Sequence, residues 1–291
     1  MRITILIGAF FLLCTCDRAT NTEASLNTSA SLIGAAAIQN TPVDTSAKIL
    51  SKRFVPPAGF VRQLAPEGSF ARYLQELPLK PHGSLVHYFD GRVKRRSSVH
   101  AAVVDLDVGK RDLQQCADAI MRLRGEYLFH KNDFDNLSFN FTNGFPAKFS
   151  KWAAGQRIKV SGNDVNWYAG GRKDHSYQNF RKYTDMVFAY AGTLSLEKEL
   201  VSIPLDSLAI GDVFIQGGSP GHAIIVVDLL THESSEEKLF LLAQSYMPAQ
   251  EIHILQNPRD KNRSPWYSTQ IQGRLVTPEW IFDFSDLKRF E

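Results

Sequence analysis

Residues 219–228 read Ser-Pro-Gly-His-Ala-Ile-Ile-Val-Val-Asp, and this stretch is the strongest indication of the fold. The apolar run after His222 is short and rich in β-branched residues, which predicts a buried strand over 222–230. Other strands are expected at 210–215, 239–243 and 251–255. Because the helical patterns come earlier and the strands follow as a run, the sequence predicts an α+β domain with an antiparallel sheet.

The pattern around Cys116 predicts a helix, since apolar residues recur at helical spacing on both sides of it. Asp112 is expected to be the N-cap, and Gln115 completes a capping-box pattern three residues later. Cys116 therefore falls in the first helical turn or just after it. A second helix is expected over 176–191.

The N-terminus is typical of an export signal. One early charge, Arg2, precedes an apolar run over 3–13 that is too short for a stable membrane anchor but suits the core of a signal peptide. The run ends Leu-Cys-Thr-Cys, which resembles the cleavage box of bacterial lipoproteins. Either Cys14 or Cys16 could be the lipidated residue, and Cys16 fits better because a small residue precedes it. An ordinary secretory signal cut slightly later is the alternative.

The rest of the chain divides into a tether and one domain. We predict a lipoprotein-type signal peptide over 1–16, a flexible tether rich in Thr, Ser, Ala and Asn over 17–52, and a single α+β domain over 53–291. The domain is long enough for a sizeable core. The protein is therefore expected to be exported to the cell envelope and anchored through lipid to a bacterial membrane.

Composition argues against several other classes of function. The formal net charge of +3 is too mild to indicate a nucleic-acid partner, and the basic run over 92–96 is interpreted as a solvated loop. The eight histidines are scattered, with no His-x-x-x-His or Cys-x-x-Cys spacing. Neither a metal nor another cofactor is therefore expected.

Cys116 is the first candidate for chemistry. It is the cysteine that the exported domain keeps after processing, so it has no disulfide partner there. A thiol at a helix N-terminus becomes more nucleophilic because free N–H groups and the helix dipole lower its pKa. The alternative is a structural cysteine, buried on an apolar stripe with Leu113 and Ile120.

His222 and Gln244 are the expected partners of that thiol. His222 follows a glycine-rich loop and begins a strand, where it could act as the base for a thiol, or it is a structural histidine that bonds its own loop. On the next strand, Gln244 could accept a hydrogen bond from the second ring nitrogen and fix the tautomer. Ser245 is the second choice for that role.

The order of these segments resembles the papain-like cell-wall peptidases of the NlpC and CHAP type. The resemblance rests on the helix-borne Cys116, on Ile-Gly-Asp-Val-Phe-Ile at 210–215, on Gly-His-Ala-Ile-Ile-Val-Val-Asp at 221–228 and on Ala-Gln-Ser at 243–245. It implies a papain-like arrangement, with a helix-borne cysteine packed on an antiparallel sheet. It also implies hydrolysis of amide bonds in peptidoglycan peptides, with Cys116 as nucleophile, His222 as base and Gln244 as orienting group.

Two features depart from that family's pattern. Cys116 stands in Gln-Cys-Ala rather than in Asp-Cys-Ser or Asn-Cys-Thr, and the interval from Cys116 to His222 is longer than in the compact families. The hairpin and the second helix inside this interval are therefore expected to be an insertion. The chain as a whole also resembles a family of uncharacterised bacterial lipoproteins, mostly from Bacteroidetes-like organisms, which implies no activity.

Three further residues are candidates for substrate binding. Tyr246 and Gln216 are close in sequence to the proposed site, and Arg122 lies on what is interpreted as the exposed side of the cysteine helix. Our hypothesis is a thiol-dependent amide hydrolase that acts on cell-wall peptides in the bacterial envelope, with a peptide or peptidoglycan fragment as its partner. The alternative is a non-catalytic envelope lipoprotein that binds a peptide or glycan, in which Cys116 is structural.

Overall fold

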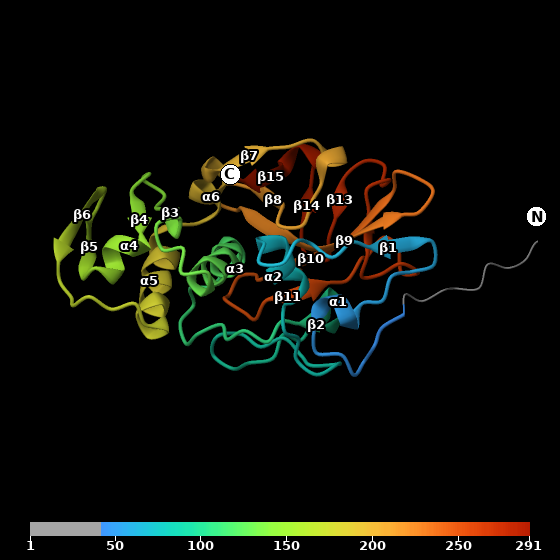
Figure 1. Ribbon diagram of the computed structural model, residues 1–291, viewed down its shortest axis with the longest axis horizontal. Helices are drawn as coiled ribbons and strands as arrows, with labels where there is room; N and C mark the ends of the chain where they lie inside the picture. Colours follow the sequence, from blue (N-terminus) through green and yellow to red (C-terminus); the bar gives the residue numbers. More distant parts are fainter. Residues whose placement is uncertain (1–41) are drawn as a thin grey trace, which may run out of the picture. The chain divides into compact units, whose positions relative to one another are not determined.

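The fold is built on one antiparallel sheet (Figure 1). The computed structural model describes residues 42–291, and the largest sheet there has nine strands. Seven follow the order β2-β11-β10-β9-β8-β15-β7, while β1 pairs with β9 and β12 pairs with β10. The bounds of these strands are β1 Phe60–Arg62, β2 His100–Val103, β7 Leu200–Ser202, β8 Val213–Gln216, β9 His222–His232, β10 Lys238–Gln244, β11 His253–Leu255, β12 Tyr267–Ser268 and β15 Leu287–Phe290.

Six helices and three small hairpins complete the described part of the chain. The helices are α1 Leu50–Arg53, α2 Phe70–Gln75, α3 Cys116–His130, α4 Phe149–Ala153, α5 Tyr177–Tyr190 and α6 Thr193–Glu199. The hairpins pair β3 Ser138–Asn140 with β4 Pro146–Lys148, β5 Gln156–Ser161 with β6 Asp164–Ala169, and β13 Leu275–Val276 with β14 Ile281–Phe282. The predicted α+β class with an antiparallel sheet is confirmed.

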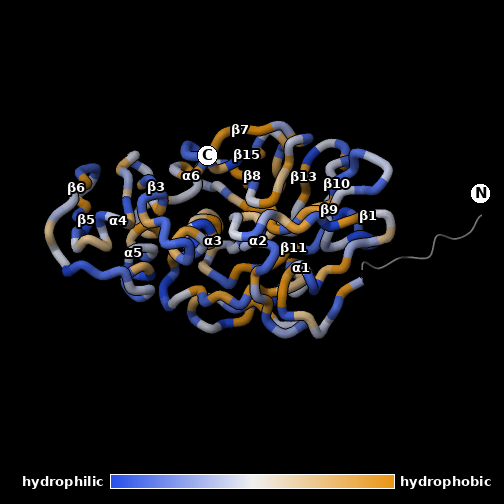
Figure 2. The backbone as a smooth tube through the Cα atoms, in the orientation of Figure 1, coloured by the Kyte–Doolittle hydropathy of each residue, from blue (hydrophilic) through white to orange (hydrophobic). Residues whose placement is uncertain are grey.

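β9 is the central strand, and it is buried on both faces. Ala223, Ile225 and Val227 belong to the larger apolar cluster, which also holds the buried face of α3. Ile224 and Val226 point to the other face, into a second cluster that the C-terminal segment covers. Each fully buried aliphatic side chain contributes about 1.5–3 kcal/mol to folding. This two-sided burial explains the continuous apolar run in the sequence, and Figure 2 shows apolar residues around β9, β11 and α3.

The segment between α3 and β7 extends away from the main sheet. Figure 1 shows β3, β4, β5, β6, α4 and α5 gathered on the side of α3 that lies away from β9. Aromatic packing joins this group to α3, for example between Phe129 and Phe180, whose ring centroids are 4.7 Å apart. The predicted hairpin and second helix are present as β5–β6 and α5.

The start of α3 differs from the prediction by three residues. α3 begins at Cys116 with Gln115 as its N-cap, and the backbone N–H of Gln115 donates to Asp118 Oδ2 at 3.0 Å. Asp112, the expected cap, instead accepts a hydrogen bond from the backbone N–H of Ala249 at 2.7 Å. A long-range contact therefore takes the capping residue away, and Cys116 becomes the first residue of the helix.

The folded domain begins before residue 53, which is the first residue of the domain predicted from the sequence. Leu50 is fully buried in the core, and Val43 forms a β-bridge with Phe54. The predicted signal peptide, Cys16 and the tether up to residue 41 lie outside the described residues. Within residues 42–291, no helix is both long enough and apolar enough to span a bilayer.

Candidate active site

Cys116 is placed at the start of α3 and is 5 % exposed. Burial raises the pKa of its thiol to about 11, and the nearby Asp118 carboxyl adds to this rise. The backbone N–H groups of Ala223 and Ala117 near the sulfur oppose the rise in its pKa. The expected lowering of the pKa by the helix N-terminus is therefore wrong for the protein at rest, because burial outweighs it.

Asp118 is a second unusual group at this helix start. Its side chain is 6 % exposed, and burial raises its pKa well above the ordinary range. Its Oδ2 accepts the hydrogen bond from the N–H of Gln115, while Oδ1 is buried with no partner among residues 42–291. A carboxyl group whose charged form is disfavoured by burial therefore lies near the thiol.

His222, the first residue of β9, has no exposed surface. Its Nε2 lies 2.9 Å from Gln244 Oε1. The rings of Tyr246, Trp280 and Phe282 pack around the imidazole, with centroids 5.0, 5.3 and 5.9 Å away. Burial lowers the pKa of His222 to about 4, so the ring is neutral at neutral pH.

A buried polar network lies behind Gln244. The Nε2 group of Gln244 donates to Glu279 Oε2 at 2.7 Å and contacts His253 Nε2 at 3.3 Å. Glu279 also pairs with Lys94 Nζ at 2.6 Å. Because a carboxylate oxygen can only accept, Gln244 must present its N–H groups to Glu279 and its carbonyl oxygen to His222. The orientation of this amide is therefore fixed by charge.

This network also sets the tautomer of His222. Since Gln244 Oε1 can only accept, His222 Nε2 must carry the proton. His253 agrees with this arrangement, because its Nδ1 faces the carbonyl of Glu251 at 2.8 Å and so leaves its Nε2 to accept from Gln244. The unprotonated Nδ1 of His222 is buried and has no hydrogen-bond partner among the described residues. A neutral nitrogen base is thus left with its lone pair free.

The His222 imidazole and the Cys116 thiol are both close to Ala223. The backbone N–H of Ala223, the residue directly after His222, lies near the sulfur of Cys116 and opposes the rise in its pKa. Cys116 also contributes to the electrostatic environment of Tyr246, whose ring packs on His222. No hydrogen bond joins the sulfur to His222 Nδ1 at rest. Catalytic hydrogen bonds are often long before substrate binds, so the absence of this bond at rest is compatible with a catalytic pair.

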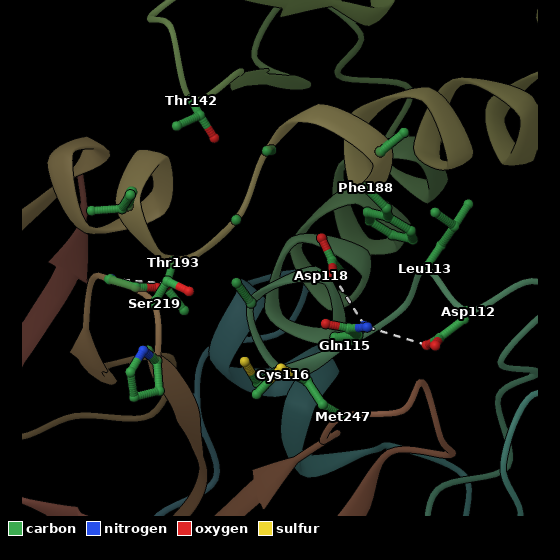
Figure 3. Close-up of a pocket in the computed structure, with 18 residues that line it drawn as sticks. Asp112, Leu113, Gln115, Cys116, Asp118, Thr142, Phe188, Thr193, Ser219 and Met247 are labelled. Carbon is green, nitrogen blue, oxygen red and sulfur yellow. Dashed lines mark hydrogen bonds between the residues drawn. The ribbon is translucent and has the colours of Figure 1, made fainter.

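Cys116 opens onto a cavity of about 740 Å³. The walls come from the start of α3 at 112–118, the end of α5 and start of α6 at 188–194, and the loop at 218–221, with Thr142 and Met247 at the margins. Figure 3 shows Ser219 and Thr193 on one side of Cys116, with Leu113 and Phe188 on the other. The cavity is large enough for a small peptide, and Cys116 is one of the residues that line it.

The glycine-rich loop before His222 is held closely against α6. A Cβ on Gly221 would lie 2.5 Å from Thr193 Oγ1 and 2.7 Å from the carbonyl oxygen of Gly218. Thr193 Oγ1 in turn bonds the backbone of Gly218 at 3.3 Å. The loop therefore needs glycine at this position, and its packing fixes where β9 begins and where His222 lies.

Of the other residues predicted for the site, one lies beside His222 and two are held by other contacts. Tyr246 packs against His222, so it lies beside the proposed site as expected. Gln216 accepts from Trp280 Nε1 at 2.8 Å and donates to Asp286 at 2.7 Å. Its amide therefore holds Trp280 over the imidazole and is not free for a substrate. Ser245 is buried and bonds the backbone carbonyls of Gln114 and Gln250, which excludes it as the partner of His222.

The prediction that Arg122 lies on an exposed helix face is wrong. Arg122 is fully buried, pairs with Glu126 at 2.6 Å and also contacts the hydroxyl of Tyr177 at 3.0 Å. Because α5 covers this side of α3, the charges that suggested a solvated face form a buried ion pair. Arg122 therefore stabilises the packing of α3 and cannot reach the cavity above Cys116.

Sequence reasoning missed the residues behind Gln244. Lys94 belongs to the basic run that was interpreted as a solvated loop, yet it is buried against Glu279. Glu279, Trp280 and His253 come from the last fifth of the chain. No local pattern marks such long-range partners. Within the described part of the chain, no group of three His, Cys, Asp or Glu side chains could hold a metal ion.

Comparison with known proteins identifies a family but no activity. A family model described as "Domain of unknown function (4846)" matches residues 50–289. No curated protein and no solved structure matches the chain.

Proposed function

We propose that this chain, which belongs to the family described as domain of unknown function 4846, is a thiol-dependent amide hydrolase. In this proposal Cys116 is the nucleophile, His222 is the base and Gln244 holds the imidazole. One observation carries it: the unprotonated His222 Nδ1 is buried with no partner among the described residues, and the next residue, Ala223, lies near the thiol of Cys116, which lines the cavity. An unsatisfied buried nitrogen costs about 1–3 kcal/mol, which a fold retains where function requires it.

The reaction follows from these groups. His222 Nδ1 takes the thiol proton as the sulfur of Cys116 attacks the carbonyl carbon of the amide. The C–N bond then breaks, and His222 returns the proton to the leaving amine, which leaves a thioester on Cys116. Water attacks this thioester while His222 takes its proton, and the proton returns to the sulfur as the carboxylic acid departs.

The neutral resting pair supports general-base catalysis. The pKa of about 11 for Cys116 and of about 4 for His222 keep both groups uncharged near pH 7. The thiolate and imidazolium therefore form only as the sulfur attacks. Gln244 then accepts from the charged ring, and the carboxylate of Glu279 lies directly behind it to stabilise the positive charge.

Two donors near the sulfur suit the developing oxyanion. The first N–H groups of α3 have no partner within the helix, as at every helix N-terminus, and Cys116 is its first residue. The Gln115 side chain also lines the cavity, where its Nε2 donates to Asp112 at 3.1 Å. We propose that the backbone N–H of Cys116 and the amide of Gln115 hold the carbonyl oxygen.

We propose cell-wall peptides as the substrate class and a papain-like arrangement for the fold. The support is the resemblance of residues 210–228 and 243–245 to the NlpC and CHAP peptidases, together with the order of helix-borne cysteine, strand-borne histidine and polar residue on the next strand. The signal-like N-terminus would place the protein in the bacterial envelope, where such peptides occur, with Cys16 as the lipidated residue.

The direct test is cleavage of soluble peptidoglycan fragments by the mature chain, followed by mass spectrometry. The expected result is cleavage of one amide bond, with loss of roughly 10³-fold or more in rate for Cys116→Ala. Ser235→Ala, in the exposed turn between β9 and β10, is the matched control and should cleave like the wild type. Equal cleavage by wild type and Cys116→Ala would refute the proposal.

The burial of the thiol favours a second candidate, a non-catalytic lipoprotein that binds a peptide or glycan. Under this alternative Cys116 is a structural residue, as its 5 % exposure and raised pKa suggest. Alkylation by iodoacetamide separates the two functions. Labelling of the folded protein that slows in His222→Ala supports the hydrolase, whereas labelling only after unfolding supports the binding protein.

A further inference from the structure

A second cavity, of about 270 Å³, lies beside the one above Cys116. Leu113 and Phe188 line both, so the two are neighbours. The walls of the second cavity are the loop at 108–114 and one face of α5. Nothing in the proposed hydrolysis uses it.

The lining of this cavity carries an excess of positive charge. Four of its side chains are basic and one is acidic, namely Lys110, Arg111, Arg181, Lys182 and Asp185. On α5, Arg181, Lys182 and Asp185 fall at the three- and four-residue spacing that places side chains on one helix face. Because four cations converge on one small space, an anion there would meet a favourable potential.

The carboxylates nearby leave part of this charge uncompensated. Asp185 lies 3.9 Å from Arg111, and Asp107 lies 3.5 Å from Arg181. Asp107 is also shared with Arg122, at 3.3 Å. Burial lowers the pKa of Arg181, and the neighbouring Arg122 lowers it further. Because Arg122 already pairs with Glu126 at 2.6 Å, the two carboxylates offset two of the four cations of the cavity, and the charge of its two exposed lysines remains.

Gln114 adds a buried hydrogen-bond donor of fixed orientation. It lines the cavity and is 1 % exposed. Its Oε1 accepts from Arg122 at 3.0 Å, which fixes the orientation of the amide because a guanidinium can only donate. The N–H groups on Nε2 then remain, buried and with no partner among residues 42–291. A buried donor without a partner next to four cations indicates that the missing partner is an acceptor.

We infer that this cavity binds an anionic oxygen group, a carboxylate or a phosphate, held by Lys110, Arg111, Arg181 and Lys182. Oxyanions accept several charge-assisted hydrogen bonds at once, which suits two guanidinium groups, two ammonium groups and an amide N–H in one cavity. A bound anion would lie next to the cavity above Cys116. The inference rests on the lining residues alone and does not require Cys116 to be a nucleophile.

Binding is tested with the full mature chain by titration calorimetry. Inorganic phosphate and malonate are the two probes, at fixed pH and at an ionic strength held constant with sodium chloride. Saturable binding of either probe above the chloride background supports the site, and the tighter of the two assigns phosphate or carboxylate as the preferred group. Absence of binding for both probes overturns the inference.

Paired charge variants locate the binding. The double variant Lys110→Gln, Lys182→Gln changes two exposed side chains of the cavity, and binding is expected to weaken by about tenfold because two of the four cations are removed. The control Lys159→Gln, Lys173→Gln removes the same charge from exposed positions elsewhere and should leave the affinity within twofold. Equal weakening in both double variants would show a general charge effect and overturn the inference. Cys116→Ala should bind like the wild type, which keeps this result separate from the test of hydrolysis.

Discussion

The proposed role of His222 depends on which ring nitrogen carries the proton, and the neighbouring side chains determine this. Lys94 pairs with Glu279, Glu279 orients the Gln244 amide, and that amide holds the proton of His222 on Nε2. Each step follows from which atoms can only donate or only accept. A lysine that never touches the cavity therefore determines which ring nitrogen is free to act as a base.

Removing the orienting amide should lower turnover more than substrate affinity. For Gln244→Ala we expect kcat to fall by about 10²-fold, within the range for general acid–base catalysis, with a smaller change in KM. The nitrogen NMR shifts of His222 provide a readout that a loss of stability would not reproduce. They should show a protonated Nε2 in the wild type and mixed tautomers in the variant. The exposed Gln63→Ala serves as control, and an unchanged tautomer would contradict the account.

Asp118 should destabilise the fold increasingly as pH rises. Burial raises the pKa of Asp118 in the folded state, because the fold favours its neutral form. The contribution of this group to stability is therefore fully present below the ordinary pKa of 3.8 and is lost as pH rises through the folded pKa. The uncharged Asp118→Asn avoids this loss. Urea unfolding should therefore show the stability of the variant, relative to the wild type, increasing from pH 4 to pH 8. A difference that is constant with pH would mean that Asp118 is not buried as a neutral acid.

At the scale of elements, the site lies where α3, α6 and the start of β9 converge. Cys116 comes from α3, Thr193 from α6, and Gly221 directly precedes β9. The close approach of Gly221 to Thr193 and Gly218 leaves no room for a Cβ. The glycine loop thus couples the position of α6 to that of His222.

A methyl group at Gly221 should therefore disturb the site. For Gly221→Ala we expect a loss of about 1–3 kcal/mol in the free energy of unfolding, as for other overpacking changes, and reduced turnover because the loop must shift. Gly192→Ala is the matched control on the same cavity, because a Cβ there meets no atom within 4 Å. Thermal unfolding and hydrolysis rates are the measurements. Equal effects of the two substitutions would show that loop packing does not position His222.

Local patterns predicted the elements but not their partners. The apolar run of β9 and the helical spacing of α5 are short-range signals, and both elements formed where expected. Asp112 is not the cap of α3 because it accepts a hydrogen bond from the distant Ala249, and Arg122 is buried because Tyr177 of α5 covers it. Lys94 and Glu279 meet although most of the chain separates them. Such contacts depend on tertiary packing, which no local window of the sequence contains.

At the scale of the whole molecule, buried titrating groups give the fold two opposing responses to pH. Burial lowers the pKa of His222 to about 4 and of His253 to about 3, so acid must charge groups that the fold holds neutral. Burial raises the pKa of Glu199 to about 7 and that of Asp118 above its ordinary range, which favours the fold in acid. The net pH dependence of stability is therefore flatter than either set of groups alone would give.

The histidine contribution can be isolated with one substitution. Because the folded pKa of His222 is depressed, its contribution is present above the ordinary value of 6.5 and is lost as pH falls toward about 4. A glutamine side chain does not titrate in this range. The free energy of unfolding of His222→Gln, relative to that of the wild type, should therefore rise by about 2 kcal/mol as pH falls from 7 to 5. Urea unfolding at the two pH values measures this change. The exposed Ser235→Ala serves as the control and should show no such trend, and a flat result for His222→Gln would contradict the buried neutral state.

The central claim is that His222 activates the Cys116 thiol, and acyl transfer from p-nitrophenyl acetate tests it without knowledge of the natural substrate. The account predicts a transient acetyl group on Cys116, detected by mass spectrometry of the intact chain and of its peptides, with none on that residue in Cys116→Ala. In His222→Ala, acylation should slow by about 10²- to 10⁴-fold, the usual contribution of a positioned base. Acylation at the same rate in wild type and His222→Ala, or none on Cys116 in the folded wild type, would contradict the account.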